Sequence, residues 1–177
     1  MDRDWLESPL NKQYPITSRG NYKNGKRDGL WESYHDNGEL RFIHNYKDGK
    51  EDGLHVWYHD NGQLHEKGNY KDGKEDGLNE WYHDNGQLRE KGNYKDEKKD
   101  GLWEFYDPDC QLEFIGNYKD GKPDGLWEYY DEEGNLTKTE EWKDGELIPF
   151  KDGLVEEFYK KGKLRFKGNY KNGILDG

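Results

Sequence analysis

The sequence lacks cysteine pairs and long apolar runs. Cys110 is the single cysteine among 177 residues, so no disulfide framework can form within the chain. This cysteine usage fits a reducing compartment, and we expect the cytoplasm. The first ten residues, MDRDWLESPL, contain no apolar run of the length found in a signal peptide. No stretch elsewhere in the sequence is long and apolar enough to cross a membrane.

Basic side chains are in the minority. The chain has 28 lysines and arginines against 39 aspartates and glutamates, and its formal net charge is −11. Nucleic-acid binding requires a basic stripe that displaces counterions from phosphate, and none is present. The same charge disfavours anionic membrane surfaces. An acidic protein suits a basic protein partner, but such charge also keeps an open sheet soluble, and the sequence leaves both interpretations open.

What the sequence does contain is a repeat. Asp-Gly-Leu triplets recur every 24 residues, and the last interval widens to 28 because of an insertion near residues 146–150. The leucines of these triplets are Leu30, Leu54, Leu78, Leu102, Leu126 and Leu154. Only 29% of residues are hydrophobic, but 15% are aromatic, and the rings occupy fixed positions of the repeat. A fixed period of this size indicates a repeat array rather than a disordered chain.

Each repeat has the pattern of one β-hairpin. Asp-Asn-Gly at residues 36–38, 60–62 and 84–86 is a hairpin turn, and Lys-Asp-Gly at residues 47–49 and 71–73 begins a second turn. Short runs rich in Trp, Tyr, Phe and Leu separate the turns and are typical of strands. A helix of useful length would have to cross glycines, each of which costs about 1 kcal/mol.

The sequence therefore predicts an all-β protein, an elongated single-layer antiparallel sheet of tandem β-hairpin repeats about 24 residues long. Residues 16–22 are expected to form an orphan first strand. Six hairpin repeats follow from about residue 30, which makes about thirteen strands, and residues 1–15 are expected to cap the N-terminal edge. The open edges of such a sheet also allow an edge-to-edge homodimer.

Comparison of the repeats with one another separates constant positions from variable ones. The constant positions are those of Leu30, Tyr34, Leu40 and Tyr46, and the variable positions are those of Trp31 and Ser33. A three-residue turn would pair Tyr34 with Leu40 and Leu30 with His44. That register places the constant positions on one face, which we predict to be the packed face. The variable aromatic positions then lie on the opposite face.

The variable face is the candidate recognition surface, because Trp and Tyr are common anchors of protein interfaces. The candidate partner-binding residues are Trp31, Trp57, Trp81, Trp103, Phe105, Trp127 and Tyr129. The alternative is that these rings only stack between neighbouring hairpins. The same face assignment predicts that replacing Tyr82 with alanine destabilises the protein more than replacing Asn79.

Three places depart from the repeat. Cys110, two residues after Pro108, occupies the position of the turn glycines, which predicts a changed turn type. Glu97 replaces the glycine of Lys-Asp-Gly. The insertion near residues 146–150 contains Pro149 and predicts a bulge at one edge of the sheet, where a contact loop could lie.

No pattern indicates catalysis, a metal or a cofactor. His35, His59 and His83 occupy the same position of three successive repeats, and equivalent residues of successive hairpins lie about 10 Å apart, too far to share one ion. Carboxylates recur in every hairpin, whereas a catalytic acid–base pair is normally singular. Cys110 has no histidine near it in the sequence. We therefore expect a protein that is not an enzyme and that binds no metal and no cofactor.

Tyr70-Lys-Asp-Gly-Lys-Glu-Asp-Gly77 resembles the MORN (membrane occupation and recognition nexus) repeat, an aromatic residue followed by Asn/Asp-Gly-Lys and a further glycine. Trp-Glu-Phe-Tyr at residues 103–106 and Asn-Gly-Gln-Leu at residues 85–88 resemble the bacterial variant of this repeat. The likeness covers about residues 16–177. Bacterial proteins of this kind are often assigned to the YwqK-type toxin–antitoxin antitoxins. The resemblance thus implies an antitoxin or immunity protein that neutralises a partner toxin, expected to be basic, or alternatively a MORN-type scaffold near membranes.

Overall fold

A computed structural model describes residues 17–149, 153–158, 164–171 and 174–175, and these residues form strands and turns without a helix. The strands are β1 (Ser18–Lys23), β2 (Lys26–Tyr34), β3 (Leu40–Lys47), β4 (Lys50–Tyr58), β5 (Leu64–Lys71), β6 (Lys74–Glu75), β7 (Gly77–Tyr82), β8 (Leu88–Lys95), β9 (Lys98–Tyr106), β10 (Leu112–Lys119), β11 (Lys122–Tyr130), β12 (Leu136–Lys143), β13 (Glu146–Ile148), β14 (Gly153–Phe158), β15 (Leu164–Lys171) and β16 (Ile174–Leu175). The cap predicted for residues 1–15 lies outside the described residues.

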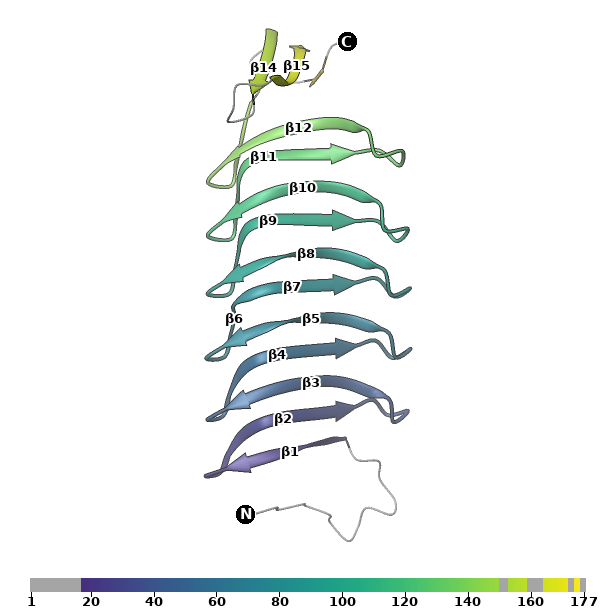
Figure 1. The fold of residues 1–177 in the computed structure, drawn as a ribbon, viewed down its shortest axis with the longest axis vertical. Helices are drawn as coiled ribbons and strands as arrows, with labels where there is room; N and C mark the ends of the chain where they lie inside the picture. Colours follow the sequence, from purple (N-terminus) through teal and green to yellow (C-terminus); the bar gives the residue numbers. More distant parts are fainter. Residues whose placement is uncertain (1–16, 150–152, 159–163, 172–173, 176–177) are drawn as a thin grey trace.

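The strands β1 to β13 form one open antiparallel sheet in which strands consecutive in the chain lie side by side. They are stacked one above another along the long axis of the molecule (Figure 1). The short strand β6 pairs with β5 next to β7, and β14, β15 and β16 form a separate three-stranded sheet. The predicted all-β architecture, an antiparallel sheet of tandem hairpins of about 24 residues, is confirmed.

Two kinds of turn join the strands. At the Lys-Asp-Gly turn, Asp48 (φ 51°) and Gly49 (φ 87°) both have positive φ, as a two-residue hairpin loop requires. At the Asp-Asn-Gly turn, the backbone N–H of Gly38 donates to the carbonyl of His35 (2.9 Å), and that of His35 donates to the carbonyl of Glu39 (2.8 Å). The two turns alternate along the chain and return each strand beside the previous one.

A one-residue bulge follows the Asp-Asn-Gly turn. Tyr34 pairs with Leu40 as predicted, but the next pair is Ser33 with Phe42, so the residue between Leu40 and Phe42 has no opposite. Every later pair is displaced by one residue. The predicted pairing of Leu30 with His44 is therefore wrong, and Trp31 lies opposite His44 instead. Because side chains alternate along a strand, this one-residue displacement exchanges the faces.

The sheet consequently has a ring face and a leucine face. We define the ring face by the positions of Trp31, Ser33 and Tyr46 and the leucine face by those of Leu30, Tyr34 and Leu40. The prediction that the constant leucines form the packed side is wrong, because Leu30, Leu54, Leu78 and Leu102 are 46–47% exposed. The buried tryptophans, Trp31, Trp103 and Trp127, lie on the ring face with exposures of 7%, 0% and 6%.

The core is a single row of side chains on the ring face, which we call the core row. It consists of Gly20, Trp31, His44, His55, Gly68, Asn79, Gly92, Trp103, Gly116 and Trp127. The indole of Trp103 covers Gly92, and its Nε1–H donates to the carbonyl of Asn93 (3.2 Å). The strand glycines thus make room for rings that cover the backbone.

The irregular positions keep the repeat geometry. Cys110 adopts φ 66°, and its N–H donates to the carbonyl of Asp107 (3.0 Å), as the turn glycines do. The predicted change of turn type is therefore wrong, and Cys110 accepts a left-handed conformation that usually favours glycine. Glu97 also adopts φ 66°. The first part of the insertion extends the sheet as β13 instead of bulging from it, and Phe150 lies outside the described residues.

Candidate interaction face

A second row of side chains runs beside the core row on the ring face, on the side of the Asp-Asn-Gly turns. We call it the outer row. Its members lie opposite one another across successive strands and are Ser33, Phe42, Trp57, Glu66, Trp81, Glu90, Phe105, Phe114, Tyr129 and Lys138. Its six aromatic side chains are partly exposed, in contrast to the tryptophans of the core row.

The rings of the outer row are packed against one another at its ends. Phe105 and Phe114 stack at 4.3 Å between ring centroids, and Phe114 lies 5.7 Å from Tyr129. At the other end Phe42 lies 5.0 Å from Trp57. Neighbouring rings hold one another in place, so they offer a rigid apolar surface at little cost in conformational entropy.

The middle of the outer row alternates rings with carboxylates. Glu66 lies between Trp57 and Trp81 in the register, and Glu90 lies between Trp81 and Phe105. The side chain of Glu66 is 18% exposed and accepts a hydrogen bond from Nε2 of His55 (2.9 Å). Glu90 is already ion-paired with Lys99 and with Arg89 (3.0 Å each), so Glu66 carries the negative charge that a basic protein surface could complement beside the rings.

The seven predicted partner-binding residues divide between the two rows. Trp57, Trp81, Phe105 and Tyr129 lie in the outer row, at every second strand, and are partly exposed. Trp31, Trp103 and Trp127 lie in the core row, where their rings cover strand glycines or a histidine and have almost no surface to offer a partner. Binding by the first four stays a prediction, and the last three serve the core of the sheet.

A third row of rings, predicted to lie on the opposite face, follows the other side of the core row. This tyrosine row consists of Tyr22, Tyr46, Tyr70, Tyr94, Tyr118 and Trp142. Burial raises the pKa of Tyr94 to about 12 and raises the pKa of Tyr70 further, so these hydroxyls stay neutral at physiological pH. The bulge after the turn decides which face these rings occupy, and no residue type marks it in the sequence. The unpaired residues of the bulges are Arg41, His65 and Arg89 in three successive repeats.

Two basic side chains of the protein itself lie over these rings. Nζ of Lys99 lies 3.7 Å from the centroid of the Trp103 ring, and the guanidinium carbon of Arg27 lies 4.5 Å from that of Trp31. Contacts of this kind stabilise a cation by about 0.5–2 kcal/mol, the larger value when the cation is desolvated. The ring face therefore already binds cations within the chain.

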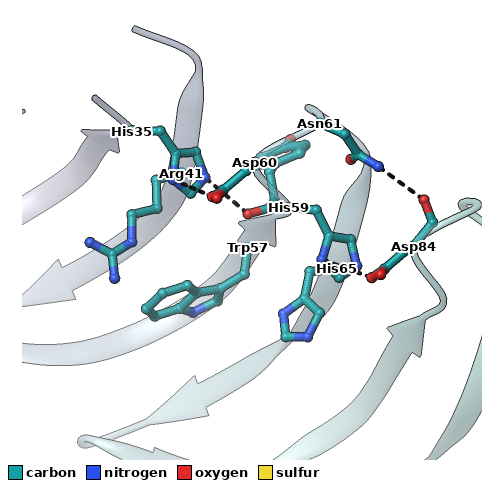
Figure 2. Close-up of a pocket in the computed structure, with 9 residues that line it drawn as sticks. His35, Arg41, Trp57, His59, Asp60, Asn61, His65 and Asp84 are labelled. Atoms are coloured by element: carbon teal, nitrogen blue, oxygen red, sulfur yellow. Dashed lines mark hydrogen bonds and ion pairs between the residues drawn. The ribbon is translucent and has the colours of Figure 1, made fainter. Parts of the chain in front are cut away.

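A shallow hollow of ≈ 470 Å³ lies where the outer row meets the Asp-Asn-Gly turns (Figure 2). Arg41 and Trp57 line one side of it, and His59 and His65 line the other, with their rings 4.5 Å apart. Burial, and then the nearby His59, lower the pKa of His65. The hollow extends the outer row with groups that donate hydrogen bonds.

The recurring histidines connect successive turns. Nδ1 of His35 lies 2.9 Å from Oδ1 of Asp60, and Nε2 of the same ring lies 3.2 Å from the carbonyl oxygen of Tyr58 (Figure 2). In the next pair of turns, Nδ1 of His59 lies 3.4 Å from Oδ1 of Asp84. Over the described part of the chain, no three His, Cys, Asp or Glu side chains are grouped so as to hold a metal ion. His35 and His59 thus each link their own turn to the next one along the sheet.

The leucine face carries ion pairs between neighbouring strands. Nζ of Lys67 lies 2.5 Å from Oε2 of Glu80, and Tyr82 donates its hydroxyl to the same oxygen (2.7 Å). Burial opposes the ionisation of Glu80, but the hydrogen bonds from Lys67 and Tyr82 prevail and hold its pKa below the ordinary value. Lys91 and Glu104 repeat the pair one hairpin later (2.7 Å). The charges of these two pairs are neutralised within the chain.

Comparison with known families identifies the repeat. The model of the MORN repeat variant matches residues 27–48, 51–72, 75–96, 99–120, 123–144 and 151–172. No curated protein gives a significant match. In the residues with a described position, no helix is long and apolar enough to span a membrane.

One solved structure shows a limited likeness. The chain is similar, at 18% identity, to part of a chain in the crystal structure of the GtfA/B complex bound to UDP and GlcNAc. The alignment covers 77% of this chain and 27% of that chain, with a TM-score of 0.25. A likeness at this TM-score carries no argument about fold or function.

Proposed function

Because this chain belongs to the MORN repeat variant family, we propose that it is a non-catalytic antitoxin or immunity protein that neutralises a basic toxin by covering part of its surface. The repeats indicate a repeat-based binding or scaffold protein. Our proposal adds two points to this: the partner is a toxin, and binding neutralises it.

The observation that supports this proposal is the alternation of rings and carboxylates in the outer row. Trp57, Trp81 and Phe105 supply partly exposed apolar area, and Glu66, which pairs with no lysine or arginine among the described residues, supplies negative charge between the first two. Strands about 4.8 Å apart make the ten-residue row roughly 40 Å long, enough for a protein interface of ordinary size. Aromatic anchors beside complementary charge are typical of the energetic centre of an interface.

The net charge of −11 supports a basic partner by a second, longer-range effect. An acidic surface attracts a basic protein before contact and raises the rate of association. The attraction is screened over about 10 Å at 0.1 M salt and about 3 Å at 1 M. We therefore expect the overall charge to raise the rate of association and the rings to lower the rate of dissociation.

The test is co-expression with the product of the neighbouring gene. If that product is a basic toxin, it should co-purify with this protein, and its toxicity should be suppressed. Association should slow as salt rises. Trp57→Ala and Trp81→Ala should raise the dissociation rate, each with a loss on the order of 2 kcal/mol if the residue is a hot spot. Leu102→Ala, on the opposite face, is the matched control and should leave dissociation unchanged.

Two results would contradict the proposal. A bound neighbour whose dissociation is unaffected by Trp57→Ala and Trp81→Ala would remove the outer row from the interface. Absence of any protection on co-expression, together with binding to anionic vesicles, would favour the membrane scaffold instead.

A further inference from the structure

Lys99 shows how the ring face holds a cation. Its Nζ lies 3.7 Å from the centroid of the Trp103 ring, 5.0 Å from that of Phe105 and 5.3 Å from that of Tyr118. The same atom forms an ion pair with Oε2 of Glu90 (3.0 Å). The site thus combines rings from the core, outer and tyrosine rows with one carboxylate of the outer row.

The preceding repeat builds the same site with the cation replaced by an acid. Moving each residue back by one 24-residue period puts Glu75 at the position of Lys99 and Glu66 at the position of Glu90. Trp81 and Tyr94 take the positions of Phe105 and Tyr118, and their ring centroids are 5.8 Å apart. We call Glu66, Glu75, Trp81 and Tyr94 the acidic ring cluster.

The remaining position of the site, that of Trp103, holds a smaller side chain in the preceding repeat. Asn79 stands where Trp103 stands in the next repeat, and it is fully buried. Its Nδ2 donates to Oε1 of Glu75 (3.2 Å), so the amide fixes the carboxylate among the rings. Because Asn79 has no ring, the aromatic surface of the cluster comes from Trp81, Tyr94 and the neighbouring Tyr70.

The two carboxylates of the cluster lack a basic partner of the kind that Lys99 provides. Among the residues the structure describes, neither Glu66 nor Glu75 forms an ion pair with a lysine or arginine, and His55 alone bonds to Glu66. Burial raises the pKa of Glu75, and the nearby Glu66 and Glu97 raise it further, while His55 opposes them. Glu75 is thus a partly buried carboxylate beside a second one, with a histidine but no lysine or arginine paired to either among the described residues, and its negative charge is unfavourable in the isolated chain.

We propose that the acidic ring cluster binds a lysine or arginine side chain of the partner protein. The incoming cation pairs with Glu66 and Glu75 while its methylene stem lies against Trp81 and Tyr94, as Lys99 does one repeat further along. The inference rests on the proposed function, to which it adds the chemical group that the partner must present at one place.

The aromatic rings of the cluster favour a lysine or arginine side chain over a metal ion as the ligand. A metal ion prefers several oxygen ligands, and the described residues hold no group of three or more acidic, histidine or cysteine ligands. A lysine or arginine brings both a charge and an apolar stem, and the stem gains from burial against aromatic rings. The cluster offers both kinds of contact.

The test uses the full chain and an acetylated tetralysine amide as the probe, titrated at low salt. Binding should shift the indole N–H signal of Trp81, assigned with Trp81→Phe. Glu75→Lys supplies the missing cation from within the chain, so it should weaken probe binding about tenfold or more, a change of about 1.4 kcal/mol. The same variant should raise the melting temperature, since the introduced lysine would pair with Glu66 as Lys99 pairs with Glu90.

Glu133→Lys is the matched control, because it makes the same charge change at an exposed turn. Equal weakening by Glu75→Lys and Glu133→Lys would show that the probe reads only overall charge and would overturn the proposal. Glu75→Gln and Glu66→Gln, which introduce no new cation, should each also weaken binding more than Glu133→Gln, and they decide the outcome if Glu75→Lys fails to fold. A toxin held as tightly by Glu75→Lys as by the native chain would refute the cluster and leave the proposed function standing.

Discussion

The indole of Trp103 lies so close to Gly92 that a Cβ atom added to Gly92 would stand 2.3 Å from both Cδ2 and Cε2 of the ring. Gly92 has no positive φ, so the ring and not the backbone conformation requires the glycine. The same relationship holds between Trp31 and Gly20 and between Trp127 and Gly116. In a sheet one layer thick, this contact replaces the second layer that usually buries a sheet face.

Trp103 and its neighbour Leu102 should differ sharply in their contribution to stability. Trp103 is 0% exposed on the ring face, whereas Leu102 is 47% exposed on the leucine face. Trp103→Ala should therefore cost about 3–5 kcal/mol, as for other buried large side chains, and Leu102→Ala less than about 1 kcal/mol. Urea unfolding followed by circular dichroism measures both. Equal costs would contradict the face assignment derived from the bulge.

Gly92→Ala should be harmful only while the Trp103 ring is present. In the native chain the added Cβ forces the indole aside, at a cost of about 1–3 kcal/mol. In a Trp103→Ala background the space is free, and alanine is favoured over glycine within a strand by about 0.5–1 kcal/mol. A double-mutant cycle measures this coupling. Additive effects of the two substitutions would show that Gly92 is required for another reason.

The repeat, the hairpins and the two turns follow from local chemistry, and all three could be predicted from the sequence. Asp48-Gly49 shows why, since both residues tolerate the positive φ that the turn requires. The face assignment failed at the position of Arg41, where the unpaired residue of the bulge has no signature. Side chains alternate with a period of two, so one unpaired residue was enough to exchange the faces. Constancy across the repeats was misleading too, because the constant Leu102 is exposed while the variable Trp103 is buried.

The same correction changes what is expected of two other residues. Tyr82 was expected to matter more than Asn79 because it occupies a constant position. Asn79 is fully buried, accepts a hydrogen bond from the N–H of Asn69 (3.0 Å) and donates one to Glu75. Tyr82 is partly exposed on the leucine face. Replacing Asn79 would remove these hydrogen bonds at a buried position. The prediction that replacing Tyr82 destabilises the protein more than replacing Asn79 therefore no longer follows.

Glu75 and Glu80 should respond in opposite ways to neutralisation. Burial, and then the nearby Glu66, raise the pKa of Glu75 above its unfolded value, so its ionised form opposes folding. This penalty is present at pH above the folded pKa and vanishes as pH falls below the unfolded pKa. Glu75→Gln should therefore raise the melting temperature at about pH 7 and give no gain near about pH 3.

Glu80 is the control of opposite sign. The hydrogen bonds from Lys67 and Tyr82 outweigh burial and lower its pKa, so its ionised form favours folding above the unfolded pKa, and this contribution is lost as pH falls through the folded pKa. Glu80→Gln should lower the melting temperature at about pH 7, with a smaller effect in acid. Shifts of the same sign for both variants would contradict the assigned environments.

Removal of one whole repeat should leave a folded, shorter protein. Deletion of residues 99–122 joins Lys98 to Pro123 and places Trp127 over Gly92, where Trp103 stood, because both tryptophans occupy the same position of the repeat. Each hairpin contacts only its neighbours, so the remaining sheet keeps its pairing and shortens by about 10 Å. The maximum dimension from solution scattering measures the change.

Deletion of residues 99–110 is the control: it removes one strand, brings β8 beside the parallel β10 without a crossover, and should prevent folding. A folded half-repeat deletion, or an unfolded whole-repeat deletion, would show that stability does not depend on the register of neighbouring hairpins.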